Sequence, residues 1–268
     1  MISNFVFDEW DGPAIKVFSA EAETAAPDAP IVFVMHGVRR NADDYRDNWI
    51  DIAREYQLRV YAPEFDSKNF PGAKNYNLGG VNAGASHSAF DAVEPLFEYL
   101  GSTRGITNRG YVIFGHSAGA QFVHRFVCFA DTSHMNLAIA ANAGWYTLVN
   151  ADEAWPYGLK NIPGEQCSAS DWLSKPLLVL LGDQDTDAND PYLRRTPEAM
   201  AQGAHRLARG LNFLQGAREY SDAHNLPVAW RFEVVENIGH DDLGMAREAG
   251  VIIGQLGTNA PKLANKVQ

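Results

Sequence analysis

Three residues that could together carry out acyl chemistry lie far apart in this sequence of 268 residues: Ser117, Asp185 and His240. Ser117 is the centre of the run Gly-His-Ser-Ala-Gly, which fits the pattern G-x-S-x-G. A serine becomes a nucleophile when a histidine accepts its proton, and a carboxylate can fix that histidine in the required tautomer. These residue types therefore point to nucleophilic attack on a carbonyl carbon.

The residues around Ser117 predict a strand, a sharp turn and a helix. An apolar run at 111–114 precedes the motif, and a run compatible with a helix follows at 118–130. A serine at the apex of such a turn clears the end of the sheet, and Gly115 and Gly119 avoid crowding where strand and helix meet. The start of the helix would also direct free amides and a positive dipole end at the reacting carbonyl.

The candidate acid and base each follow a later predicted strand. His240 follows the strand predicted at 228–236, and of the eight histidines only His240 follows a late strand after the candidate acid. Asp185 follows the strand predicted at 176–181 after a short turn, which suits a carboxylate that reaches over its neighbour. The alternatives for the acid are Asp183, Asp187 and Asp190.

Two backbone amides are expected to form the oxyanion hole. One belongs to Ala118, directly after the nucleophile, and the second belongs to the loop after the strand predicted at 31–35, at Val38. His36 and Gly37 would shape the turn that carries Val38.

Aromatic and basic residues near these strand ends allow two interpretations each. Trp145 and Tyr146 could form the wall of an acyl or alcohol pocket, or they could be ordinary packing residues. For Arg39 and Arg40 we favour a structural ion pair over contact with substrate. The candidate partners of these arginines are Asp43, Asp44 and Asp47.

The remaining pattern alternates strands with helices. A hairpin is predicted at 5–10 and 14–19, further strands at 59–65, stopped near Pro63, and at 137–143, and a long loop at 66–85. Helices are predicted at 42–56 with Asn41 as cap, at 86–100 with a kink or split at Pro95, at 197–224 with interruptions at Gly210 and Gly216, and at 241–256, before a frayed tail from 257.

This alternation predicts an α/β fold: a mostly parallel central sheet, an antiparallel N-terminal hairpin at its edge, and helices on both faces. Residues 1–268 are expected to form a single domain with a small cap insertion at about 147–174, where aromatic residues and prolines gather. Ligands of such sheets bind at the carboxyl ends of the strands, which is where the candidate residues lie.

Composition excludes several other classes of protein. The net charge is −11 and no basic patch is visible, so neither nucleic acid nor an anionic membrane surface is an expected partner. No apolar run is long enough to span a membrane and no signal peptide is visible, so we expect a cytoplasmic protein. Cys128 is expected to be a small buried hydrophobe, and the sequence leaves open a disulfide between Cys128 and Cys167.

We expect no metal and no cofactor. The run from Asp183 to Asp187 begins like a calcium-binding loop, but Ala188 stands where a glycine is needed and Arg194 where a glutamate is needed. No cluster of histidine and cysteine has the spacing of a zinc site.

Five segments of the chain resemble the α/β-hydrolase superfamily, and within it the esterases of the poly(3-hydroxybutyrate) depolymerase-like group. They are Val-Met-His-Gly-Val-Arg-Arg-Asn-Ala at 34–42, Phe-Gly-His-Ser-Ala-Gly-Ala-Gln-Phe at 114–122, Asn-Ala-Gly-Trp-Tyr at 142–146, Leu-Gly-Asp-Gln-Asp at 181–185 and Ile-Gly-His-Asp at 238–241. The order serine, acid, histidine is also the order of that superfamily.

The resemblance implies a cofactor-free serine hydrolase that cleaves a carboxylic ester through an acyl-enzyme. No linker or polymer-binding domain is visible, so we expect short soluble esters or hydroxyalkanoate-type oligomers as substrates. Two alternatives stay open: a peptidase or amidase that uses the same triad, and a non-catalytic hydrolase fold used for binding. The sequence does not indicate the oligomeric state.

Overall fold

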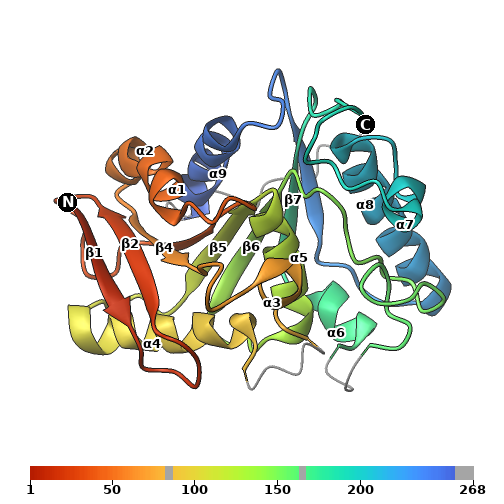
Figure 1. Ribbon diagram of the computed structural model, residues 1–268. Coiled ribbons are helices and arrows are strands. Elements are labelled where there is room, and N and C mark those ends of the chain that lie inside the picture. Colours follow the sequence, from red (N-terminus) through yellow and green to blue (C-terminus); the bar gives the residue numbers. More distant parts are fainter. Residues whose placement is uncertain (82–86, 163–166, 257–268) are drawn as a thin grey trace.

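A computed structural model describes residues 1–81, 87–162 and 167–256 of the chain. These residues form one sheet of eight strands in the order β1-β2-β4-β3-β5-β6-β7-β8 (Figure 1). The β1–β2 and β2–β4 pairs are antiparallel, and every pair from β4–β3 to β7–β8 is parallel. The strands are β1 (Ile2–Phe7), β2 (Ile15–Glu21), β3 (Ile31–Met35), β4 (Arg59–Glu64), β5 (Tyr111–His116), β6 (Met135–Ala141), β7 (Leu177–Gly182) and β8 (Arg231–Val235).

Helices cover both faces of the sheet (Figure 1). One face carries α1 (Ala42–Asn48), α2 (Ile50–Glu55) and α9 (Asp242–Leu256). The other face carries α4 (Val93–Arg104), α5 (Ala118–Phe129), α6 (Ala169–Ser174) and α8 (Arg206–His224). Three short elements lie in connections: α3 (Gly72–Asn75), η1 (Ala89–Ala92) and α7 (Pro197–Ala201).

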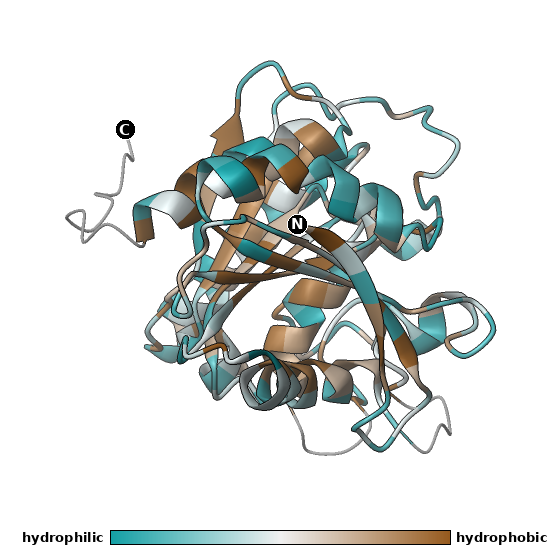
Figure 2. Ribbon diagram, turned by 90° about the vertical axis from the view of Figure 1, so that its left-hand side faces the viewer, coloured by the Kyte–Doolittle hydropathy of each residue, from teal (hydrophilic) through white to brown (hydrophobic). Residues whose placement is uncertain are grey.

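The alternation of side chains along each strand builds two apolar layers. In β3, Phe33 and Met35 belong to the layer under α4 and α5, and Val32 and Val34 belong to the layer under α1 and α9. Figure 2 shows apolar residues concentrated in the central strands. A parallel sheet that is buried on both faces needs such continuous apolar runs. The predicted fold class is confirmed.

The predicted helix at 42–56 is in fact two helices. The break falls at Trp49, whose fully buried indole packs edge-on against Phe114 with ring centroids 5.2 Å apart. Asn41 precedes α1 as predicted, but its side chain caps no backbone amide and instead donates to the Asp44 carboxylate. Packing of a large aromatic residue thus overrides the simple helical pattern.

Two prolines were predicted to interrupt elements, and one of the two predictions is correct. The expected split at Pro95 is confirmed, because η1 ends before α4 and Pro95 occupies the first turn of α4, where the missing amide costs little. The strand β4 does not stop at Pro63 but continues to Glu64, with Pro63 opposite Val17 of β2. The predicted helix start at Ser86 lies outside the described residues.

The predicted interruptions of the long C-terminal helical region are wrong in position. Gly210 and Gly216 lie inside the continuous helix α8, and the break falls at 202–205 instead. A Cβ atom at Gly210 would meet the Leu181 side chain, so glycine here permits close packing on the sheet. The break contains Gly203 with φ +146°, a conformation that other residues rarely adopt.

The two cysteines form a disulfide between Cys128, at the end of α5, and Cys167, with the Cα atoms 5.4 Å apart. Cys128 is buried as predicted, but it is a bridge residue rather than a lone hydrophobe. Disulfides are typical of oxidising compartments, so this bond does not favour the cytoplasmic location, which stays a prediction. None of the described helices is long and apolar enough to cross a membrane.

The segment predicted as a cap, 147–174, contains α6 and an isolated bridge between Ala154 and Lys160. Its residues 163–166 lie outside the described part of the chain, as do residues 82–85 of the predicted loop and the tail from 257. The Leu148 amide donates to the Tyr157 carbonyl, which folds the first part of the segment back on itself.

Candidate active site

Ser117 lies on the turn between β5 and α5, with φ +58° and ψ −114°. Such a backbone conformation is strained for a residue with a side chain, and it lifts a nucleophile clear of the sheet. A Cβ atom at Gly115 would meet the backbone of Gly119, and one at Gly119 would meet the Met35 carbonyl. The predicted strand, turn and helix are confirmed, and both glycines are required by the close approach of backbones.

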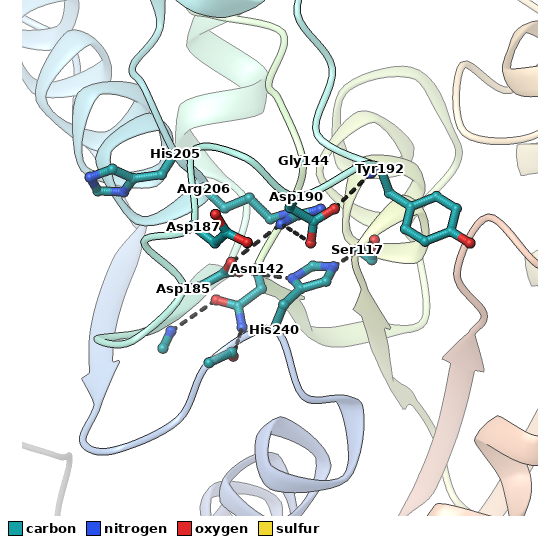
Figure 3. Close-up of polar contacts among 12 residues, drawn as sticks. Ser117, Asn142, Gly144, Asp185, Asp187, Asp190, Tyr192, His205, Arg206 and His240 are labelled. Carbon is teal, nitrogen blue, oxygen red and sulfur yellow. Dashed lines mark hydrogen bonds and ion pairs between the residues drawn. The ribbon is translucent and has the colours of Figure 1, made fainter.

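The structure brings the predicted Ser117, Asp185 and His240 into one hydrogen-bonded chain (Figure 3). His240 Nε2 lies 3.1 Å from Ser117 Oγ, and His240 Nδ1 lies 2.8 Å from Asp185 Oδ2. Because a carboxylate can only accept, we assign the hydrogen to Nδ1, which leaves Nε2 free to accept from the serine hydroxyl. Asp185 is 2% exposed, so its carboxylate is shielded from water.

The three alternative aspartates make hydrogen bonds to groups other than His240. Asp187 accepts the amide of Asn189, and Asp190 accepts the amide of Tyr192 and an Arg206 N–H. Asp183 lies in the turn directly after β7, where its amide donates to Val235. Only Asp185 among these four residues is hydrogen-bonded to His240 in the described structure.

Arg206, at the start of α8, contacts the carboxylate of Asp185 on the side away from His240. Its Nη1 lies 3.4 Å from Asp185 Oδ1 and 3.1 Å from Asp190 Oδ2. Arg206 and Asp185 are each 2% exposed, so the pair is buried, and a buried carboxylate needs such compensation. Asp185 Oδ2 remains available to His240.

The turn that carries Val38 is organised around the neutral ring of His36. His36 Nε2 accepts the amide of Phe65, and the Tyr76 hydroxyl donates to the His36 carbonyl. Complete burial lowers the pKa of His36 to about 3, so the ring is uncharged at neutral pH. A Cβ atom at Gly37 would meet the Tyr45 hydroxyl. His36 and Gly37 thus shape this turn as predicted.

A cavity of about 290 Å³ opens beside Ser117. Val38 and Ala118 both border it, and within the described part of the chain neither of their amides donates to another backbone group. The other lining residues are Arg40, Ser67, Gly72, Ala73, Tyr76, Asn77, Gln121, Gly144, Trp145, Tyr192, Arg194 and Arg206. A larger hollow of about 670 Å³ lies at the amino ends of β3 and β5 and is lined by no triad residue, so size does not identify the site.

Trp145 and Tyr146 have different environments. Trp145 lines the cavity, with the guanidinium of Arg125 4.2 Å from its ring centroid and that of Arg194 5.0 Å away. Tyr146 does not line it; its fully buried ring stacks on Phe213 with centroids 4.5 Å apart. The pocket interpretation therefore fits Trp145, and the packing interpretation fits Tyr146.

Arg40 is not held by the predicted ion pair. Its guanidinium donates to the carbonyls of Phe65, Phe70 and Gly72 and stacks on Tyr76 at 4.2 Å. Neither Arg40 nor Arg194 has a carboxylate within salt-bridge distance in the described residues, although both line the cavity. The reason is local geometry: the chain turns at Arg40 with φ +60°, and its side chain reaches the loop after β4.

A buried polar cluster lies next to His240. The ring centroid of His116 is 4.5 Å from that of His240, and the Tyr45 hydroxyl is 3.2 Å from His116 Nδ1. Asp242 Oδ1 lies 3.7 Å from the same nitrogen. Burial lowers the pKa of His116 well below its ordinary value and raises the pKa of Asp242 to about 7. Of these groups, His116 packs directly against the His240 ring, and Tyr45 and Asp242 contact His116.

Reasoning from sequence missed Asn142, Arg206 and the cluster of Tyr45, His116 and Asp242. Asn142 had one visible signal: it is a polar residue at the end of the apolar run that forms β6. Arg206 had none, because it meets Asp185 only through the packing of α8 on β7. No group of described residues has the composition and geometry of a metal site.

Two solved structures resemble this chain along almost its whole length. The poly(aspartic acid) hydrolase-1 of Sphingomonas sp. KT-1 is 40% identical, with 94% of this chain and 98% of that chain covered and a TM-score of 0.89. The poly(3-hydroxybutyrate) depolymerase LpqC of Bordetella parapertussis is 30% identical, with 98% and 93% covered and a TM-score of 0.87. The serine hydrolase FphF of Staphylococcus aureus shares the fold at 16% identity, with 94% and 96% covered and a TM-score of 0.62.

A scan of protein-family models and a search of curated proteins each found no match. The fold and the solved structures nevertheless define the class of this protein, which is a hydrolase of the α/β type. The chain belongs to the α/β-hydrolase superfamily and is similar to its poly(3-hydroxybutyrate) depolymerase-like esterase group.

Proposed function

We propose that the protein is a serine hydrolase that cleaves carboxylic esters through an acyl-enzyme. The observation that carries this proposal is the hydrogen-bonded chain from Ser117 Oγ through His240 to Asp185, with distances of 3.1 and 2.8 Å. Ser117 is the nucleophile, His240 is the general base and acid, and Asp185 fixes the imidazole tautomer and stabilises the imidazolium.

The reaction proceeds in two halves. Ser117 Oγ attacks the ester carbonyl while His240 Nε2 takes its proton, and the amides of Val38 and Ala118 stabilise the resulting oxyanion. The C–O bond to the alcohol then breaks, and His240 returns the proton to the leaving oxygen. Water repeats the same sequence on the acyl-enzyme, which releases the carboxylic acid and restores Ser117.

Short soluble esters or hydroxyalkanoate-type oligomers are the proposed substrates. A cavity of about 290 Å³ with Trp145 in its wall accommodates a short acyl or alcohol group.

We also propose that the single domain carries its cap at 147–174, because Tyr157 of this segment packs against Trp145 with ring centroids 4.6 Å apart.

Amide cleavage in an anionic polymer is the second candidate. It is favoured by Arg40 and Arg194, two cavity residues without a salt-bridge partner among those described, in a chain of net charge −11. The 40% identical protein is named for the hydrolysis of poly(aspartic acid). The same triad can attack an amide, with His240 protonating the leaving nitrogen.

A substrate panel separates these candidates. Purified protein is incubated with nitrophenyl esters of graded acyl length, with 3-hydroxybutyrate oligomers and with poly(aspartic acid), each with the Ser117→Ala variant as control. Ester turnover that peaks at short acyl chains and is lost in the variant supports the leading proposal. Depolymerisation of poly(aspartic acid) without ester preference would shift the assignment to the amide. Absence of turnover, together with absence of labelling by a fluorophosphonate, would indicate a binding protein and contradict both.

A further inference from the structure

One buried side chain outside the triad contacts both the end of the strand that leads to the acid and the loop that carries the base. Asn142 directly follows β6 and is completely buried. Its Nδ2 donates to the Gly239 carbonyl at 3.0 Å, and its Oδ1 accepts the Gly182 amide at 2.8 Å (Figure 3). Gly239 directly precedes His240, and Gly182 lies three residues before Asp185. A single carboxamide therefore joins the end of β7, directly before the Asp185 loop, to the loop that follows β8.

The two loops are in close backbone contact around this carboxamide. The Gln184 amide donates to the Ile238 carbonyl at 2.9 Å, and a Cβ atom at Gly182 would meet the carbonyls of Ile238 and Gly239. The backbone N–H of Asn142 donates to the Leu180 carbonyl at 3.0 Å. The side chain thus lies at a point where a small shift of either loop would change the distance between Asp185 and His240.

The residue type fits this position in two ways. A primary amide offers a donor and an acceptor on the same planar group, which is what the Gly239 carbonyl and the Gly182 amide require. Asn142 also has φ +50°, a left-handed conformation that asparagine, aspartate and glycine tolerate better than other residues. Asn142 does not line the cavity beside Ser117, so it has no expected contact with substrate.

We propose that Asn142 is a positioning residue for the reaction: it joins the end of β7, where the acid loop begins, to the base loop and so sets the position of the His240 ring between Asp185 and Ser117. This inference rests on the proposed serine mechanism. Its consequence is specific. Loss of the carboxamide bonds should lower the rate of the chemical step and leave substrate binding unchanged, because the cavity itself keeps its lining.

Two substitutions test this role, and both replacement residues, aspartate and glycine, tolerate the left-handed backbone conformation of position 142. Asn142→Asp keeps the size and the acceptor for Gly182 but turns a second acceptor toward the Gly239 carbonyl. Asn142→Gly removes both side-chain bonds. Asn225→Gly is the matched control, because Asn225 has φ +53° at the end of α8, is exposed, and contacts neither loop. Active sites are counted with a fluorophosphonate, and kcat and KM are measured per labelled site.

We expect kcat per labelled site to fall about 10- to 100-fold in both Asn142 variants, the size associated with a misplacement of about 1 Å, with KM within about 2-fold of wild type. The second-order labelling rate of Ser117 should fall in parallel. Asn225→Gly should leave both quantities unchanged. A purely structural role would lower the melting temperature and the number of labelled sites but leave kcat per site at the wild-type value, which would overturn the proposal.

A double-mutant cycle with Asp185→Asn tests independently whether Asn142 acts through the pairing of Asp185 with His240. If Asn142 acts through the pairing of Asp185 with His240, its removal should cost less than about 3-fold once that pairing is already lost, so that the two effects are not additive. Full additivity would contradict the proposal. Failure of the serine mechanism has a different outcome, since wild-type protein would then resist the fluorophosphonate before any Asn142 variant is compared.

Discussion

The proposed active site consists of two halves that are held in place by different means. The nucleophile half comprises the elbow at 115–119 and the turn at 36–38. Close backbone packing fixes the elbow, where Gly119 lies against the Met35 carbonyl, and the His36 ring and the Tyr76 hydroxyl hold the turn. The acid–base half comprises the loops of Asp185 and His240, and side-chain bonds from Asn142 and Arg206 fix it. The elbow of the first half is contiguous in sequence, whereas the second half is assembled from four separate segments.

This difference predicts which substitutions each half tolerates. Backbone packing leaves no room for an added atom, so the nucleophile half should respond to gains in side-chain size. Hydrogen bonds depend on the identity of donors and acceptors, so the acid–base half should respond to isosteric changes that alter only chemistry. The following predictions test the two halves separately.

The largest effect is expected in the acid–base half, from a substitution that replaces one carboxylate oxygen by an amide nitrogen and leaves the size of the side chain unchanged. Asp185→Asn should lower kcat about 10⁴-fold, the value given for the corresponding change in the serine-protease triad, because the amide no longer favours the reactive tautomer. Asp183→Asn should cost far less, since Asp183 does not contact His240 in the described structure. Steady-state kinetics on both variants, with circular dichroism as a folding control, decides between them. A dead Asp183→Asn protein and a nearly normal Asp185→Asn protein would reverse the assignment.

In the nucleophile half, one added methyl group should be enough to damage the site. Gly119→Ala places a Cβ atom against the Met35 carbonyl, which belongs to a central strand and cannot yield. We expect kcat to fall about 10²-fold or more and stability to fall by about 1–3 kcal/mol. Gly216→Ala is the control, because a Cβ atom there meets open space within α8 and should stabilise the protein by up to about 1 kcal/mol. Equal kinetics of both variants would refute the packing argument.

Acid should destabilise the protein through buried neutral histidines. Burial lowers the pKa of His36, His116 and His124, so between pH about 6.5 and the folded-state pKa values only the unfolded chain binds these protons. Stability is therefore present above pH about 6.5 and is lost as the pH falls, with a slope of up to about 4 kcal/mol per unit for three protons. Urea unfolding from pH 7.5 to 5 measures the slope. His124→Gln should reduce it by about one third, and an unchanged slope would contradict this origin.

The opposite pH dependence of stability is expected for Asp242, which lies beside His116. Burial raises its pKa from 3.8 to about 7, so its contribution to stability is fully present below pH about 3.8 and is lost as the pH rises through about 7. Asp242→Asn keeps an acceptor for Asn48 and removes the ionisation. The variant should be more stable than wild type by about 1 to 4 kcal/mol at pH 8 and nearly equal to it at pH 4. Thermal unfolding at the two pH values tests this, and a variant less stable than wild type at pH 8 would contradict it.

The two halves also explain how much the sequence could predict. The elbow was predictable because its strand, turn, helix and glycines are adjacent in the chain. His240 and Asp185 were predictable as residues at strand ends, since a parallel sheet brings its carboxyl ends to one edge. Arg206 and Tyr45 were not predictable, because they reach the site only through the packing of distant elements, and Asn142 had a single signal, its place at the end of β6. Arg40 was misassigned for the same reason: its carbonyl partners lie 25 to 32 residues away.

Labelling of the intact protein by a fluorophosphonate tests the central claim most directly. The reagent reacts with a serine that a histidine activates, and mass spectrometry then gives both the number of adducts and the modified peptide. The proposed mechanism predicts one adduct on wild-type protein, located on Ser117, and none on folded Ser117→Ala protein. A wild-type protein that gains no adduct, or a Ser117→Ala variant that is labelled as fast as wild type, would contradict the assignment of Ser117 as the nucleophile.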